Sequence, residues 1–252
     1  MNPLANRSIL ITGASGGVGR AVAHLCAKNY SKLYLLDLDS NQLVKLKEHL
    51  LAEFSELSVS LFVGSVTDQE FIDNCFASIE SDQLTFDSVI HCASILRGQS
   101  GPVSLVELPT SEWEQIIDIN LTGSFLISRA ALRSFLKAKN HADLLFIGST
   151  NASNPHALDG PYVASKAGVI ALAESLNEEM MRHGIRVQTL SPDAIDTPIW
   201  DQNNSVLPKP PSLLSPTTVA EMAVRLLDLP RDGYIRNLQL YPLKTRKRKL
   251  KK

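Results

Sequence analysis

Short apolar runs alternate along this chain with longer segments of helical periodicity. The apolar runs contain several branched or aromatic residues and little polar alternation, which is typical of strands that are covered on both faces. They predict seven strands, at Ser8–Ile11, Lys32–Leu36, Leu57–Val63, Asp87–His91, Asp143–Gly148, Ile185–Leu190 and Arg236–Leu240.

Helical periodicity fills most of the intervals between these runs. It predicts helices at Gly17–Asn29, Asn41–Phe54, Asp68–Ser81, Ser111–Lys139, Pro161–His183 and Pro216–Leu227. Strands that are separated by helices pair in parallel through right-handed crossovers. We therefore expect an α/β fold of the Rossmann type, a doubly wound, mostly parallel seven-stranded sheet with helices on both faces.

Neither an internal repeat nor a linker divides the 252 residues, so residues 1–243 are predicted to form one domain. The proline-containing loop at about 199–215 follows a predicted strand, and is either a substrate cover or a passive surface excursion. Residues 244–252 are almost all cationic. This tail is either a disordered end or a site that attracts nucleic acid or anionic lipid.

The composition is that of an ordinary soluble protein, with 44% hydrophobic and 20% charged residues. A net charge of −1 excludes a general attraction of the whole molecule to nucleic acid. With no signal peptide and no uninterrupted run of about 18 apolar residues, we expect a cytoplasmic protein without a transmembrane segment. Cys26, Cys75 and Cys92 lack metal-ligand spacing, so we expect buried, reduced thiols and no metal site.

Three glycines lie in the turn between the first predicted strand and the first predicted helix, and at the start of that helix. Gly13 permits a tight turn, Gly17 permits close approach of a ligand to the backbone, and Gly19 permits the helix to pack against the strand. The helix N-terminus then offers free N–H groups to a pyrophosphate. This turn, with Ser15 and Val18 between the glycines, is predicted to bind a dinucleotide.

Asp37 ends the second predicted strand, 18 positions after Gly19. A carboxylate at this offset accepts hydrogen bonds from the adenosine ribose and repels a 2′-phosphate. Gly16 also leaves the turn without a cation for that phosphate. We therefore expect NAD(H) in preference to NADP(H), although Asp37 could instead simply begin a loop.

Tyr162 and Lys166 lie four positions apart on a predicted helix, so both project from one face. A phenol ionises near pH 10, and an adjacent ammonium is expected to lower its pKa toward neutrality. Tyr162 could then exchange a proton with a carbonyl or alcohol oxygen that Ser149 also contacts. Alternatively, the pair belongs to a solvated helix face and Ser149 caps a turn.

Taken together, these motifs resemble the short-chain dehydrogenase/reductase family in its compact single-domain form, over residues 8 to about 200. The features that carry the resemblance are Thr12-Gly13-x-x-x-Gly17-x-Gly19, Asn120, Ser149, Tyr162-x-x-x-Lys166, Ser191-Pro192 and Thr197-Pro198. It implies an NAD(P)(H)-dependent oxidoreductase, with NAD(H) favoured, that interconverts a secondary alcohol and a ketone.

The resemblance also implies roles for single residues. Lys166 would hold the nicotinamide ribose, Thr197 would contact the carboxamide, and Asn120 would anchor a proton-relay water or else only bond neighbouring backbone. Further cofactor contacts would come from Ser65, Val66 and Ala93. Family members often form tetramers through the last helix and strand, whereas the cationic tail favours a dimer through the long fourth and fifth helices.

Several positions depart from the family pattern. His91-Cys92-Ala93-Ser94 stands where Asn-Asn-Ala-Gly is usual, and Asp193 replaces a glycine near the nicotinamide. These departures motivate an alternative, a nucleotide-binding scaffold or sensor of the same fold with little or no turnover. The substrate walls are predicted at Ile95–Gly101, Thr150–Gly160 and Ile199–Pro211. Within them, Arg97, His156 and Trp200 either recognise an anionic or aromatic substrate or are ordinary loop residues.

Overall fold

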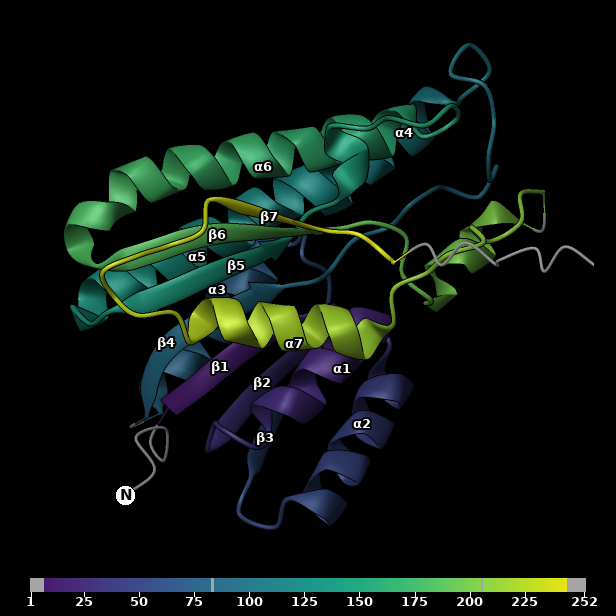
Figure 1. The fold of residues 1–252 in the computed structure, drawn as a ribbon. Coiled ribbons are helices and arrows are strands. Elements are labelled where there is room, and N and C mark those ends of the chain that lie inside the picture. Colours follow the sequence, from purple (N-terminus) through teal and green to yellow (C-terminus); the bar gives the residue numbers. More distant parts are fainter. Residues whose placement is uncertain (1–6, 83, 205, 244–252) are drawn as a thin grey trace, which may run out of the picture.

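A computed structural model describes residues 7–82, 84–204 and 206–243, so the basic tail lies outside the described residues. Seven strands form one sheet in the order β3-β2-β1-β4-β5-β6-β7, and every neighbouring pair is parallel (Figure 1). The predicted doubly wound fold is confirmed, with an entirely parallel sheet. The strands are β1 Arg7–Thr12, β2 Lys32–Asp37, β3 Ser58–Val63, β4 Thr85–His91, β5 Ala142–Ile147, β6 Ile185–Pro192 and β7 Asn237–Leu240.

Helices cover both faces of this sheet (Figure 1). They are α1 Gly17–Cys26, α2 Ser40–Glu53, α3 Gln69–Ser81, α4 Thr110–Ile117, α5 Gly123–Ala138, α6 Gly160–Met180 and α7 Pro216–Leu227. The side chains of Asp39, Asp68 and Ser215 accept hydrogen bonds from backbone N–H groups in the first turns of α2, α3 and α7. These caps satisfy donors that the helix itself leaves free.

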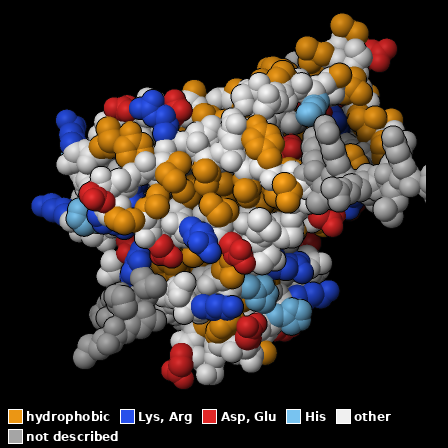
Figure 2. All heavy atoms as spheres, in the orientation of Figure 1, with side chains coloured by type: hydrophobic (Ala, Val, Ile, Leu, Met, Phe, Trp, Pro, Cys, Tyr) orange, Lys and Arg blue, Asp and Glu red, His pale blue; other side chains and the backbone are white. Residues whose placement is uncertain are grey.

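The alternation of side chains along each strand divides the interior into two cores. Ile9 and Ile11 of β1 pack in the core beneath α1, α2 and α7, whereas Leu10 packs in the core beneath α3, α5 and α6. Figure 2 shows further hydrophobic side chains gathered on the surface over α7 and β7. No helix in the described ranges is both long and apolar enough to cross a membrane.

The single helix predicted at Ser111–Lys139 is in fact interrupted. A π-helical turn, Asp118–Thr122, separates α4 from α5 and contains Asn120. The side chain of Asn120 accepts from the backbone N of Ile95 at 2.9 Å and donates to its carbonyl oxygen at 2.8 Å. These two hydrogen bonds join the helix to the segment that follows β4. The π-helical widening of the helix therefore lies at the position of a tertiary contact.

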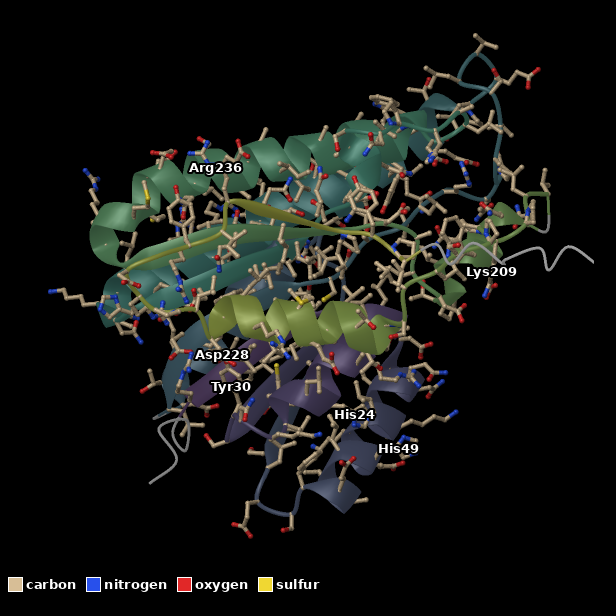
Figure 3. All side chains as sticks on the ribbon, in the orientation of Figure 1. His24, Tyr30, His49, Lys209, Asp228 and Arg236 are labelled. Carbon is tan, nitrogen blue, oxygen red and sulfur yellow. The ribbon has the colours of Figure 1, made fainter. Side chains whose placement is uncertain are left out.

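The carboxyl ends of the strands meet the segment that precedes α7. That segment contains a 3-10 helix, Pro198–Asn203, and a parallel bridge between Ile195 and Leu214. Lys209 marks this end of the molecule in Figure 3, whereas Tyr30 and Asp228 lie toward the opposite end. Loops therefore gather at the carboxyl ends of the strands. Ligands of open α/β sheets bind at this end.

Candidate active site

The glycine turn is too tightly enclosed to accept larger residues. Gly13 has φ +62°, and a Cβ on it would lie 2.7 Å from the backbone N of Ala93. A Cβ on Gly17 would lie 2.5 Å from Cγ2 of Thr197, and one on Gly19 would lie 2.1 Å from the carbonyl oxygen of Gly13. α1 also begins without a side-chain cap, so its first N–H groups remain available to an anion.

Asp37 lies at the carboxyl end of β2, beside this turn. Its carboxylate accepts from the backbone N of Ser15 at 2.9 Å and from that of Leu38 at 2.7 Å, so its position is fixed by the main chain. Arg20 and Gln42, which the sequence interpretation missed, join the same end of the cleft through a 3.0 Å hydrogen bond. Their one signal in the sequence is that Arg20 directly follows Gly19.

A cavity of about 960 Å³ runs from the glycine turn to the predicted reactive residues. It brings together nine of the predicted site residues: Gly13, Ser15, Gly17, Val18, Gly19, Ser149, Tyr162, Lys166 and Thr197. The loop at about 199–215 also contributes to its wall, through Trp200 and Leu207 among others. A single cleft therefore connects an anion-binding turn with a phenol, an ammonium and a hydroxyl.

Tyr162 remains protonated in this cleft at neutral pH. Burial raises the pKa of its phenol to about 12, and the interaction with Ser149 opposes that shift only in part. The Ser149 hydroxyl in turn accepts from the backbone N of Asn151 at 3.1 Å, which fixes the orientation of its side chain. The expectation that the pKa of Tyr162 falls toward neutrality is therefore wrong for this structure.

The position of Lys166 explains this difference. Its Nζ atom lies 5.7 Å from the ring centroid of Tyr162 and donates to the carbonyl oxygen of Ile147 at 2.8 Å. Lys166 is only 4% exposed, and burial lowers its pKa from 10.5 to about 8. The ammonium is thus directed to a neutral carbonyl, and burial makes its charged form less stable than it would be in water.

Asn120 contacts the neighbouring structure rather than the cavity. Besides Ile95, its amide donates to Oγ of Ser165 at 3.0 Å, and that hydroxyl donates to the carbonyl oxygen of Tyr162 at 2.8 Å. The side chain of Asn120 therefore makes hydrogen bonds to neighbouring backbone, which was the alternative to anchoring a proton-relay water. Its main-chain carbonyl accepts from the hydroxyl of Ser124 at 2.6 Å.

Four predicted cofactor contacts do not line the cavity: Asp37, described above, and Ser65, Val66 and Ala93. The Ser65 hydroxyl accepts from the backbone N of Thr67 at 3.1 Å, and Val66 is 6% exposed and packs beside Gly123. Ala93 lies behind Gly13, with its backbone N 3.4 Å from the hydroxyl of Thr12. The structure therefore places these residues beside the glycine turn and α5, outside the cavity that the other predicted cofactor contacts line.

The residues that depart from the family pattern have separate environments. His91 is buried, and its Nδ1 lies 2.7 Å from the hydroxyl of Thr12, while its Nε2 has no hydrogen-bond partner among the described residues. Burial lowers the pKa of His91 to about 3, so the imidazole is neutral. Cys26 and Cys75 are buried as expected, but Cys92 is only partly buried and lines the cavity.

The fold and the glycine turn define a nucleotide-binding α/β protein of the Rossmann type. The sequence profile of the family described as short chain dehydrogenase matches residues 7–207, and the chain belongs to this oxidoreductase family. A Thermotoga maritima protein named as an uncharacterized oxidoreductase is 29% identical over 245 residues, which cover 92% of each chain.

Two solved structures also match most of the chain. An alcohol dehydrogenase from Thermococcus sibiricus in complex with 5-hydroxy-NADP is 25% identical, with a TM-score of 0.81, and the match covers 95% of this chain and 98% of that one. A 3-oxoacyl-[acyl-carrier protein] reductase from Brucella melitensis with bound NAD is 25% identical, with a TM-score of 0.80 and coverage of 94% and 90%. These neighbours contain both forms of the nicotinamide dinucleotide.

Proposed function

We propose that this chain is an NAD(P)(H)-dependent oxidoreductase that interconverts a secondary alcohol and a ketone, with Tyr162 as the general acid and base. The observation that carries the proposal is the single cavity shared by the glycine turn, Ser149, Tyr162 and Lys166. The bound dinucleotide would supply a hydride to the carbonyl carbon or accept one from the alcohol carbon.

The protein would manage the proton and the charge on oxygen. During reduction, the Tyr162 phenol would donate its proton to the carbonyl oxygen, while the Ser149 hydroxyl would donate a hydrogen bond to the same atom. The phenolate left behind would regain a proton from solvent. Burial raises the pKa of Tyr162 to about 12, so the phenol carries at neutral pH the proton that reduction needs.

The test of this role is the variant Tyr162→Phe, which keeps the ring and removes the proton. We expect turnover of methyl ketones to fall by roughly 100-fold or more, because general acid catalysis contributes at least that much. NADH binding, followed by nicotinamide fluorescence, should change little. The matched control is Tyr241→Phe, since Tyr241 is 49% exposed and does not line the cavity.

Two results would contradict the proposed role. Unchanged turnover in Tyr162→Phe would exclude the phenol as the proton donor. Tight NADH binding by the wild-type protein, without turnover of any ketone or alcohol, would instead favour the nucleotide-binding scaffold.

NAD(H) is the cofactor that we favour. Asp37 is fixed beside the glycine turn, where a carboxylate would bind ribose hydroxyls and repel a 2′-phosphate. Arg20 is the opposing feature, because its guanidinium at this end of the cleft could attract that phosphate. The Ser15 carbonyl oxygen, 3.2 Å from Nη2, and Gln42 already engage it.

Titration with NADH and NADPH separates these two influences. We expect NADH to bind about tenfold more tightly, and Asp37→Asn to narrow the difference by removing the repulsion. The variant Arg20→Gln should leave the order unchanged. Tighter binding of NADPH by the wild-type protein, lost in Arg20→Gln, would overturn the preference.

We further propose that the chain forms a homodimer or a homotetramer. α5 exposes Phe125 and Leu136, which suits a contact through the long helices. The hydrophobic surface over α7 and β7 in Figure 2 suits the alternative contact. Mass photometry of Phe125→Asp and of Tyr241→Asp, both at exposed side chains, would show which face, if either, holds the copies together.

A further inference from the structure

The far end of the cavity, beyond Ser149 and Tyr162, is where a substrate would enter. Three segments that are distant in sequence contribute to the wall of this compartment: residues 96–97, residues 151–159, and residues 198–203 with 207–212. Their apolar contribution comes from Leu96, Ala157, Ile199, Trp200, Leu207 and Pro208. Such a lining recognises apolar groups, and charged side chains within it need a partner.

Arg97 is the charged residue in this wall that could most readily bind an anion. It is 7% exposed, and each of its three guanidinium nitrogens already donates a hydrogen bond. Nη2 forms an ion pair with Oδ1 of Asp159 at 2.5 Å, Nε donates to Oδ1 of Asn203 at 2.8 Å, and Nη1 donates to the carbonyl oxygen of Leu158. Its charge is therefore paired with Asp159, and each guanidinium nitrogen has a partner within the protein.

The same contacts join the three wall segments to one another. Asp159 accepts with its second oxygen from the amide of Asn151 at 3.1 Å. Gln202 accepts from the backbone N of Leu96 at 2.7 Å and from that of Arg97 at 2.9 Å. Since residues from all three segments share this network, it fixes the shape of the compartment.

Among the described residues that line this end of the cavity, no other side chain offers a free cation to a buried carboxylate. Asp193 is itself negative and accepts from the hydroxyl of Thr150 at 3.2 Å. Lys166 donates to Ile147 at the inner end of the cleft, and His156 is exposed to solvent, which screens its interactions. A substrate carboxylate would meet Asp159 and Asp193 without an unpaired partner.

We propose that this compartment binds an uncharged, mainly apolar ketone or alcohol, and that Arg97 and Asp159 are positioning residues rather than an anion receptor. The proposal rests on the proposed function, because it names the substrate class of the same site. The pair holds the walls in place, and its mutual neutralisation excludes a charged ligand.

Matched ketones test this selectivity. We would compare 4-acetylbenzamide with 4-acetylbenzoate, and a straight-chain methyl ketone ending in an amide with the one ending in a carboxylate. Each pair has nearly the same size and differs in charge. The wild-type kcat/KM should be roughly tenfold or more higher for the amide of each pair, because the acid must bury an unpaired charge.

Asp159→Asn is the decisive variant, because it keeps the shape of the side chain and leaves the Arg97 charge uncompensated. We expect the amide-to-acid ratio of kcat/KM to fall by about tenfold and the KM for the acids to decrease. The matched control is Arg97→Met, which should slow both members of each pair without moving the ratio toward the acid. A residue with a merely structural role would not lower the amide-to-acid ratio in this way.

A wild-type preference for the acids, or an unchanged ratio in Asp159→Asn, would overturn the proposal. If the wild-type protein reduces none of the ketones, the proposed function fails separately. Saturation-transfer NMR of the same pairs on the wild-type protein with NADH then measures the charge preference directly. Preferential binding of the acids in that measurement would also overturn the proposal.

Discussion

Two buried arginine–aspartate pairs lie at opposite ends of the sheet. At the amino ends of β5 and β6, Nε of Arg186 lies 2.6 Å from Oδ1 of Asp143. At the carboxyl ends, Arg97 and Asp159 form the corresponding pair beside the cleft. The chemistry is the same, but the surroundings differ, and they determine what each pair can do.

The Arg186 pair joins the chain to itself, and neither of its residues lines the cavity. The guanidinium also donates to four carbonyl oxygens between Leu227 and Gly233, in the connection from α7 to β7. The Arg97 pair instead joins segments that surround a cavity. The same kind of buried ion pair therefore has two roles in this fold. Arg186–Asp143 fastens a loop to the sheet, whereas Arg97–Asp159 shapes the wall of the cavity.

The largest effect that would test this contrast is expected from Arg186→Met. Asp143 is fully buried, so removal of its principal partner should lower the free energy of unfolding by about 3–5 kcal/mol. Urea denaturation measures this loss. Arg231→Met is the matched control, because Arg231 contacts the other oxygen of Asp143 at 2.8 Å but is 36% exposed. Equal losses in the two variants would contradict a special role for Arg186.

A second prediction concerns Lys166, whose buried ammonium donates to a backbone carbonyl and forms no ion pair with a carboxylate of the described residues. Lys166→Met removes an ammonium whose pKa is lowered to about 8, which corresponds to a penalty of roughly 3 kcal/mol at neutral pH. We expect the variant to be more stable than the wild-type protein at pH 7, by less than this amount because Ile147 loses its donor. Binding of NADH should weaken at the same time.

The dependence of this gain on pH follows from the two protonation states. Below about pH 8 Lys166 is charged in the folded and unfolded chain, so the penalty is complete. Between pH 8 and about 10.5 the folded protein loses the proton first, and the wild-type protein regains stability relative to the variant. Thermal unfolding at pH 7 and pH 10 measures both values. The control Lys137→Met, at an exposed position, should show neither effect, and a constant gain across this range would contradict the assignment.

The sequence predicts best those parts of the site that are encoded locally. The glycine turn needs three small residues within seven positions, and Tyr162 and Lys166 meet because one helical turn separates them. The Arg97–Asp159 pair joins positions that are 62 residues apart, and no periodicity encodes that contact. The pKa of Tyr162 was mispredicted because burial and the direction of Lys166 toward Ile147 depend on the folded cleft. The π-helical turn at Asn120 likewise arises from a tertiary contact with Ile95.

The last prediction concerns His91, at the carboxyl end of β4. Its pKa is lowered from 6.5 to about 3 by burial, so protonation favours the unfolded chain. The stability associated with its neutral form is complete above pH 6.5 and is lost as the pH falls, by up to about 1.4 kcal/mol per pH unit. We expect His91→Asn to flatten this acid limb in urea denaturation between pH 6.5 and 4. His24→Asn, at a surface position, should retain the wild-type slope. An unchanged slope in His91→Asn would assign the acid sensitivity to other groups. The carboxyl end of the sheet, where His91 lies, would then not differ from the amino end in its response to acid.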